Sequence, residues 1–575
     1  MGDHLRGPFS LDDDVEETEI PFFGERRDGL DALGEVLRKN KFLKFLDVSS
    51  NGIHGGGDRL PEEEEEIIDI VADMKETLQN KNNNNNNQNL KELAEKWDGL
   101  PLWQLTSPLL KHNQTLRVLN LSNNILKAEG TQMLSVALST NAVLEVLDLS
   151  NNQIPPTGLY YLSKYVLSSP TSALHTLILR KNELAGKKRN NSNNKVNKTA
   201  LAAAQFFAQS IQYNKNMKRL ILSHNHFGAV LSSALLATID TVEKLTELDF
   251  SYNEACGEHI SSFDPTAIQS IAKMMHNHEK ENNNNHQNNE NIKKVPTLRR
   301  LHLAGNNIHN KGLQLLLPSG FSLITTLEVV DLSRNNIDND GLEFISSLLL
   351  QSYVIRQLDL SFNGIESGKK LLPGLCQNTS LQGLDLSHNV LGGHPVDDEV
   401  NNNQNTNNKK QLESFAELLS AILANPNLTS LNLSYNDLTV SHFHYLSTIL
   451  RQDEMGRALT QLDVSYNPKV NLIDTRKFLL ELGGRPGLTS LSLSLPSAYE
   501  NNENNNNNHK SILEAQLEML RDVRTVVEES KSLVSVEAGI RVWDAKHNED
   551  PMYHEFVTLM EQIKKKLMYN AFLKE

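Results

Sequence analysis

The chain has 575 residues, of which 38% are hydrophobic and 6% aromatic, and its formal net charge is −15. Its two cysteines, Cys256 and Cys376, are too few for a disulfide-built fold or a cysteine-based zinc module. The acidic balance also disfavours a general nucleic-acid binder, which needs a basic face to displace counterions.

The chain begins with a flank that precedes any repeat. Residues 1–28 are acidic, and we expect them to be partly disordered. The opening MGDHLRGPFS lacks the basic and then apolar pattern of a signal peptide. No stretch of the chain has the roughly 18 apolar residues of a membrane span. These features predict a protein of the cytoplasm or the nucleus that does not bind a membrane.

From residue 29 onward, one pattern of leucines and asparagine dominates the sequence. The pattern L-x-x-L-x-L-x-x-N first occurs as LKFLDVSSN (43–51) and next as LRVLNLSNN (116–124). A thirteenth copy, from Leu488, has Pro496 in place of the asparagine, and a weaker fourteenth starts at Leu533. Most neighbouring asparagines are 26 to 31 residues apart, and the twelve are Asn51, Asn124, Asn152, Asn182, Asn225, Asn253, Asn306, Asn335, Asn363, Asn389, Asn436 and Asn467.

Each repeat predicts a short strand followed by a helix. Alternating leucines place their side chains on the inner side of a strand. The asparagine amide both donates and accepts hydrogen bonds, so stacked copies are expected to form a ladder. Behind the strand, Leu134, Ala137 and Leu138 have the i, i+3, i+4 spacing of a helix face. The array is therefore predicted to be an α/β solenoid of about 13–14 repeats, bent into a horseshoe with parallel strands on its concave face and helices on its convex face.

Copies such as LEVVDLSRNNIDNDGLEFISSLLLQSYV (327–354) resemble the ribonuclease-inhibitor-like class of leucine-rich repeat proteins. The resemblance covers residues 29–545. The class includes enzyme inhibitors, GTPase activators, actin regulators and the sensor arrays of NOD-like receptors, so the resemblance implies a fold rather than one function. Ribonuclease inhibition is disfavoured because that family is very rich in cysteine.

Asparagine-rich tracts interrupt the array without changing its register. We interpret them as loops on the rims of the horseshoe, where added length is tolerated, with aggregation-prone tracts as the alternative. The expected loops are about 54–90, 187–199, 279–294, 395–410 and 497–509. Residues 546–575 place Phe556, Leu559, Ile563 and Leu567 in helical spacing, which predicts a C-terminal capping helix; a partner-binding helix is the alternative.

No catalytic motif is present in the sequence. It has no P-loop, no HExxH, no G-x-S-x-G and no dinucleotide fingerprint. The HNH at 276–278 and the HFH at 442–444 do not have the spacing of ligands on one helix face. We therefore expect neither a metal nor a cofactor and no enzymatic activity, with the activation of a partner enzyme as the one exception.

Two columns of the concave face are the expected partner-binding surface. The residue between the last two leucines is often aspartate, which either keeps the sheet soluble or steers a basic partner. The residue before the asparagine is often aromatic or basic, and tyrosine and arginine dominate interface energetics. The candidate partner-binding residues are Tyr252, Arg300, His302, Asp331, Arg334, Asp359, Phe362, Asp385, His388, Tyr435 and Tyr466.

Two functions fit this pattern. The first is a non-catalytic scaffold or sensor that binds a protein partner, one with a basic surface, on the concave face and rims. The alternative is a GTPase-activating regulator of a small GTPase, similar to Ran GTPase-activating proteins. Those proteins often have a strongly acidic tail, whereas this chain ends in IKKKLMYNAFLKE.

Overall fold

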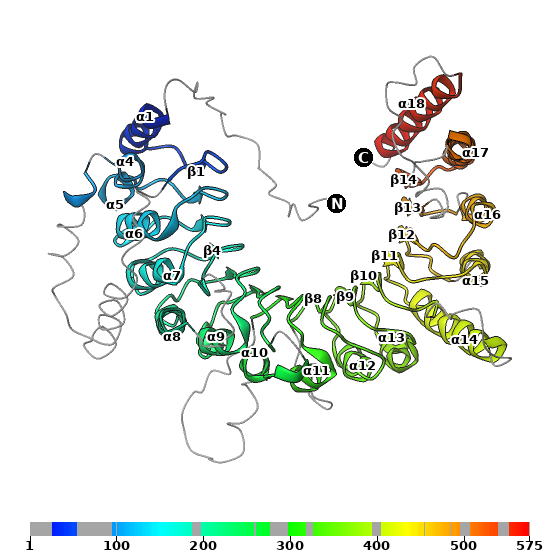
Figure 1. Ribbon diagram of the computed structural model, residues 1–575, viewed down its shortest axis with the longest axis horizontal. Coiled ribbons are helices and arrows are strands. Elements are labelled where there is room, and N and C mark those ends of the chain that lie inside the picture. The colour runs from blue at the N-terminus through cyan, green and yellow to red at the C-terminus, as the bar shows by residue number, and fades with distance from the viewer. Residues whose placement is uncertain are drawn as a thin grey trace, which may run out of the picture.

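The computed structural model is an open arc with strands along its inner edge and helices along its outer edge (Figure 1). It describes residues 26–54, 95–98, 100–186, 197–257, 260–276, 297–317, 326–393, 404–452, 455–482, 485–494, 506–538 and 551–573.

The inner edge is a single parallel sheet whose described strands, 14 in number, follow one another in chain order. Each strand has three residues, and the middle residue always points into the core, as Leu301 does at 1% exposure. The register never shifts, so equivalent residues of successive repeats lie side by side. The strands are β1 (Phe45–Asp47), β2 (Val118–Asn120), β3 (Val146–Asp148), β4 (Thr176–Ile178), β5 (Arg219–Ile221), β6 (Glu247–Asp249), β7 (Arg300–His302), β8 (Val329–Asp331), β9 (Gln357–Asp359), β10 (Gly383–Asp385), β11 (Ser430–Asn432), β12 (Gln461–Asp463), β13 (Ser490–Ser492) and β14 (Ser535–Glu537).

The helices cover the outer edge and pack on the back of the sheet. Leu134, Ala137 and Leu138 of α6 are buried there, as their spacing predicts. The buried side chains form one continuous core from Leu37 to Ile563. The helices are α1 (Arg26–Lys39), α4 (Pro101–Thr106), α5 (Pro108–Lys111), α6 (Lys127–Leu138), α7 (Pro156–Leu162), α8 (Lys198–Ile211), α9 (Gly228–Leu236), α10 (Thr266–His276), α11 (His309–Leu316), α12 (Leu342–Gln351), α13 (Leu372–Gln377), α14 (Gln404–Leu423), α15 (Val440–Leu450), α16 (Leu472–Leu482), α17 (Asn506–Glu529) and α18 (Pro551–Phe572).

The repeated asparagines bond one repeat to the next. Asn306 is fully buried, and its Nδ2 donates to the carbonyls of Phe250 (2.9 Å) and Leu303 (3.0 Å). Its Oδ1 accepts from the backbone N–H groups of Asn253 and Ala255, both at 3.2 Å. Asn51 differs because no repeat with this pattern precedes it: it is exposed, and its Nδ2 donates to its own repeat at Ser49.

A second set of buried asparagines lies at the opposite rim, where each helix leads into the next strand. Asn378 is 4% exposed, and its Oδ1 accepts from the N–H groups of Ser380 and Leu381. Its Nδ2 donates to the carbonyl of Leu349 in the preceding repeat at 2.9 Å. Each of these asparagines stands three residues before the first leucine of its copy, or before the methionine in that place, at Asn113, Asn141, Asn214, Asn378 and Asn425. Both rims are therefore held by side chains that satisfy backbone groups.

The two ends of the described array are covered by helices. At the first end, Trp97 (1% exposed) and Trp103 (5%) pack together with ring centroids 5.4 Å apart. At the other end, α18 lies beside α17 (Figure 1). Phe556, Leu559 and Ile563 of α18 are buried, and Asn570 Nδ2 donates to the carbonyl of Leu533 at 2.7 Å. Apolar side chains are thus buried at both ends of the described array.

Several expected boundaries fall outside the described residues or move. The flank up to residue 25 and most of each expected asparagine-rich loop lie outside the described residues. The helix α1 begins at Arg26, inside the expected flank. The helices α14 and α17 begin at Gln404 and Asn506, so the last residues of two expected loops are helical. Once a helix is nucleated by its apolar face, each added residue costs little, even when that residue is asparagine.

No helix among the described residues combines the length and the apolar character needed to cross a lipid bilayer.

Candidate protein-binding surface on the concave face

Three lines of side chains follow the concave face. The first and third residues of each strand point away from the core, because side chains alternate along a strand. We call the lines of first and third residues the first and second columns. The residue immediately before each ladder asparagine lies in the turn after the strand, and we call this line the turn column. The constant register aligns all three across the array.

The aspartates of the second column support the turn that follows each strand. The Oδ1 atoms of Asp359 and Asp385 each accept from the N–H of the serine two residues later, at 2.8 Å. Asp331 and Asp463 make the same bond at 3.0 and 2.9 Å. This shared role explains why aspartate recurs at the position, and it also holds the carboxylates in a row.

The central aspartates of that row crowd one another. Burial raises the pKa of Asp359 to about 7, and the charges of Asp331 and Asp385 on the neighbouring strands act in the same direction. Burial also raises the pKa of Asp463. Asp331 differs: burial opposes its ionisation, but the neighbouring His302 and the hydrogen bonds from Ser333 hold its pKa below the usual value.

In the middle of the array, acidic and basic side chains of the first column form ion pairs with one another. Glu247 is 8% exposed and accepts from Arg219 Nε at 2.8 Å. Arg300 Nη1 on the next strand reaches the same carboxylate at 3.4 Å. In the second column, His302 Nδ1 lies 3.9 Å from Asp331 Oδ2. The expected candidates Arg300 and His302 therefore lie close together but have acidic partners within the chain.

The turn column contains a continuous stack of side chains from consecutive repeats. The Arg334 guanidinium lies 3.3 Å from the centre of the Phe362 ring, and Phe362 stacks on His388 with centroids 3.6 Å apart. His388 stacks on Tyr435 at 3.9 Å, and Tyr435 stacks on Tyr466 at 4.4 Å. These spacings follow the roughly 4.8 Å separation of neighbouring strands. We call the five residues from Arg334 to Tyr466 the aromatic stack.

The backbone of the turn column fixes where these side chains point. Their φ angles are all positive, from the 52° of Phe362 to the 64° of Gly305. Non-glycine residues seldom adopt this left-handed conformation, and it persists only where the surrounding structure enforces it. In this chain, the enforcing contacts are the ladder bonds on either side of the turn.

Gly305 separates Tyr252 from the aromatic stack. Tyr252 stacks on His224 with centroids 4.2 Å apart, and on its other side it leans over Gly305. A Cβ at position 305 would lie 2.8 Å from Tyr252 Cδ1, so no larger residue fits without a shift of the ring. The candidates thus form three groups. The first is the aromatic stack with the neighbouring Asp331, Asp359 and Asp385. The second is Tyr252, which stacks on His224, and the third is Arg300 and His302, which lie between the first two groups.

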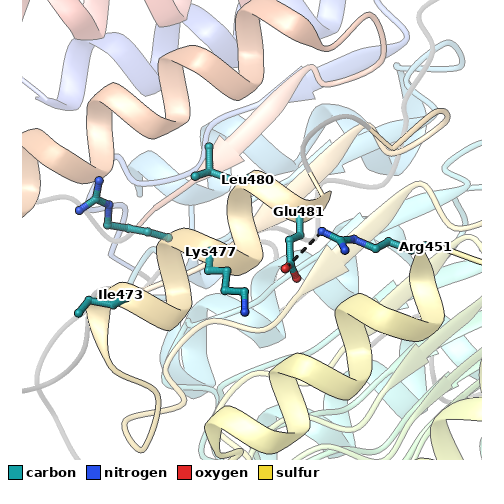
Figure 2. Close-up of a pocket in the computed structure, with 6 residues that line it drawn as sticks. Arg451, Ile473, Lys477, Leu480 and Glu481 are labelled. Carbon is teal, nitrogen blue, oxygen red and sulfur yellow. Dashed lines mark ion pairs between the residues drawn. The ribbon is translucent and has the colours of Figure 1, made fainter.

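A shallow hollow of about 510 Å³ lies on the convex side, between α15 and α16 (Figure 2). Arg451 crosses it to pair with Glu481 at 3.2 Å, and Arg476 pairs with Glu518 and Asp522 of α17. Its remaining lining includes the exposed apolar side chains Ile473 and Leu480. The hollow is built by helix-to-helix ion pairs and shares no residue with the concave face.

The described residues contain no group of three or more histidine, cysteine, aspartate or glutamate side chains placed to hold a metal ion. His442 is 4% exposed, and its Nδ1 accepts from the N–H of Thr439 at the start of α15, so it has a structural role.

The comparisons with known proteins agree with the repeat architecture. The Leucine Rich repeat model matches seven segments, 39–57, 112–135, 140–163, 296–317, 324–346, 377–393 and 424–441. A ribonuclease inhibitor from Sus scrofa is 30% identical over 196 residues. These matches make the chain similar to the ribonuclease-inhibitor-like leucine-rich repeat proteins. The aligned part is 34% of this leucine-rich repeat chain and 39% of the inhibitor, so it spans well under half of that relative.

Solved structures similar to this leucine-rich repeat chain are distant from it. A chain of the yeast complex of Rad7 and Elc1 matches with a TM-score of 0.39 and 16% identity, over 74% of this chain and 92% of that one. LegL7 from Legionella pneumophila matches with a TM-score of 0.35 and 15% identity, over 63% and 94%. Scores this low have no bearing on partner or function.

Proposed function

We propose that the protein is a non-catalytic scaffold or sensor that binds a protein partner on the concave face and rims of the array. The observation that supports this most directly is the aromatic stack. Tyr435 and Tyr466 are 39% and 42% exposed, although they belong to an ordered row of five side chains. Tyrosine and arginine supply much of the energy of protein interfaces, because they bury a large area at a small entropic cost.

General properties of the fold support the same proposal. Leucine-rich repeat proteins generally serve as protein-interaction scaffolds, and the relative from Sus scrofa is named for the inhibition of an enzyme. A solenoid offers an extended concave surface whose residues can vary without disturbing the core, since core and surface positions alternate along each strand.

Affinity purification with the full-length chain tests the proposal. The unchanged protein is compared with Tyr435→Ala/Tyr466→Ala and with the matched control Tyr213→Ala/Tyr353→Ala, whose exposed tyrosines lie between a helix and the following strand, away from the aromatic stack. We expect specific partners to be lost from the first variant and kept by the second. Partners that remain bound to both variants would argue against the concave face as the binding surface.

The GTPase-activating alternative has no specific observation in its favour among the described residues. It is tested by measuring GTP hydrolysis by a panel of small GTPases with and without the purified chain. Acceleration of one GTPase would replace the scaffold proposal, and no acceleration across the panel removes the alternative.

A further inference from the structure

The pairing of charged side chains on the concave face differs between its middle and its C-terminal half. At β5 to β7, the acidic Glu247 has two arginine partners, and Asp331 of β8 has His302. Further along, the second-column carboxylates of Asp359, Asp385 and Asp463 form no ion pair with any described residue. The first column beside them is uncharged, with Gln357, Gly383, Ser430 and Gln461. These three half-buried carboxylates therefore have no cationic partner among the described residues of their own sheet.

The aromatic stack runs directly alongside this row, three residues further along each repeat. Each inner ring has both faces covered by its neighbours in the stack, so it presents its edge and, for tyrosine, its hydroxyl group. Ring edges favour contact with apolar side chains or with the face of another ring. The one cation of the stack, Arg334, is engaged on the Phe362 ring.

The two rows together define the chemistry of a partner. A segment that fits must carry cations for the carboxylates and apolar groups for the ring edges. Single-stranded nucleic acid, which also stacks on aromatic residues, fits poorly because the carboxylates repel its phosphates and the ring faces are covered. The two requirements are met together by a polypeptide in which lysine or arginine is interspersed with large apolar residues.

We propose that the concave surface from β8 to β12 binds a basic and apolar polypeptide segment, with lysine or arginine against Asp359, Asp385 and Asp463 and apolar side chains against the edges of the aromatic stack. This inference rests on the proposed scaffold function and specifies its partner. The short side chains Gly383 and Ser430 leave the carboxylates within reach of long cationic side chains.

The test is selection of a random 16-residue peptide library on the purified full-length chain, followed by fluorescence anisotropy with the enriched peptides. We expect enrichment of peptides that combine lysine or arginine with leucine, phenylalanine or tyrosine. Their affinity should fall at least about tenfold with Asp359→Asn/Asp385→Asn, and similarly with Tyr435→Ala/Tyr466→Ala.

Matched variants separate local binding from the general acidity of the chain. At pH 8, where Asp359 is ionised, Glu413→Gln/Glu529→Gln removes the same number of charges from exposed positions on the convex helices α14 and α17, and it should leave the affinity within about twofold. Equal losses in the two charge variants would overturn the inference, because binding would then follow net charge.

Other outcomes distinguish this inference from the function on which it rests. Enriched peptides that are neutral or acidic, or no enriched peptide at all, overturn the inference. If a partner still depends on Tyr435 and Tyr466 in the affinity purification, the scaffold function stands while the inference fails. If those variants lose no partner, the scaffold function fails as well.

Discussion

Replacing Asn306 with alanine removes one complete rung of the ladder. The amide of Asn306 is fully buried and connects two successive repeats: its Nδ2 donates to carbonyls of Phe250 and Leu303, and its Oδ1 accepts from the N–H groups of Asn253 and Ala255. Alanine fills neither role. The two N–H groups then lie in the core without an acceptor, as do two carbonyls without this donor.

The expected loss of stability follows from these four groups. A buried unsatisfied N–H costs about 1–3 kcal/mol, and a carbonyl costs less because other donors can reach it. Water that enters the vacated space recovers part of this loss. We therefore expect Asn306→Ala to lower the free energy of unfolding by about 3–5 kcal/mol. Asn51→Ala is the matched control: Asn51 is exposed, and its loss should cost below about 1 kcal/mol.

Hydrogen exchange is the appropriate assay, because repeat arrays open locally and one unfolding midpoint does not describe them. The amides of Asn253 and Ala255 should lose protection in Asn306→Ala, and urea unfolding should shift to lower concentration. Equal effects of Asn306→Ala and Asn51→Ala on urea unfolding, with protection at 253–255 retained, would refute the hydrogen-bond account of the ladder.

Two further predictions concern the concave face. The pKa of Asp359 is raised to about 7 by burial and by Asp331 and Asp385, so the folded state binds this proton more tightly than the unfolded state does. The stability contributed by the protonated group is therefore lost as pH rises from about 4 toward 7. Asp359→Asn should raise the Tm at pH 8 relative to the unchanged protein and have little effect on the Tm at pH 5. A larger gain in Tm at pH 5 than at pH 8 would contradict this. Gly305→Ala should cost about 1–3 kcal/mol because of its positive φ and the contact with Tyr252, and the cost should be smaller in a Tyr252→Ala background; equal costs in both backgrounds, measured by urea unfolding, would show that the ring contact is unimportant.

The sequence predicted the architecture well because leucine spacing reports directly on which side chains enter the core. The fixed distance from Leu301 and Leu303 to Asn306 determines strand, turn and ladder together, and the parallel register then follows from stacking. The second set of asparagines was missed, although its signal was present: Asn378 stands three residues before Leu381, and other copies have the same spacing.

The candidate surface was only partly predictable. Tyr435 and Tyr466 were selected because of their residue type and repeat position. Their stacking depends on the left-handed turn, which the leucine pattern does not reveal. Glu247 was not predicted as the shared partner of Arg219 and Arg300, because this pairing depends on which residues of neighbouring repeats lie side by side. Contacts between repeats can be predicted only when the residues at equivalent positions of neighbouring repeats are compared.

Site-specific photocrosslinking tests the central claim most directly. A benzophenone amino acid replaces Tyr466 at the end of the aromatic stack or, as a control, the 84%-exposed Tyr353, and cells producing each protein are irradiated. The account predicts a covalent adduct with a partner polypeptide from position 466 and none from position 353. An adduct from position 353 with none from position 466 would contradict the claim that partners bind on the concave face.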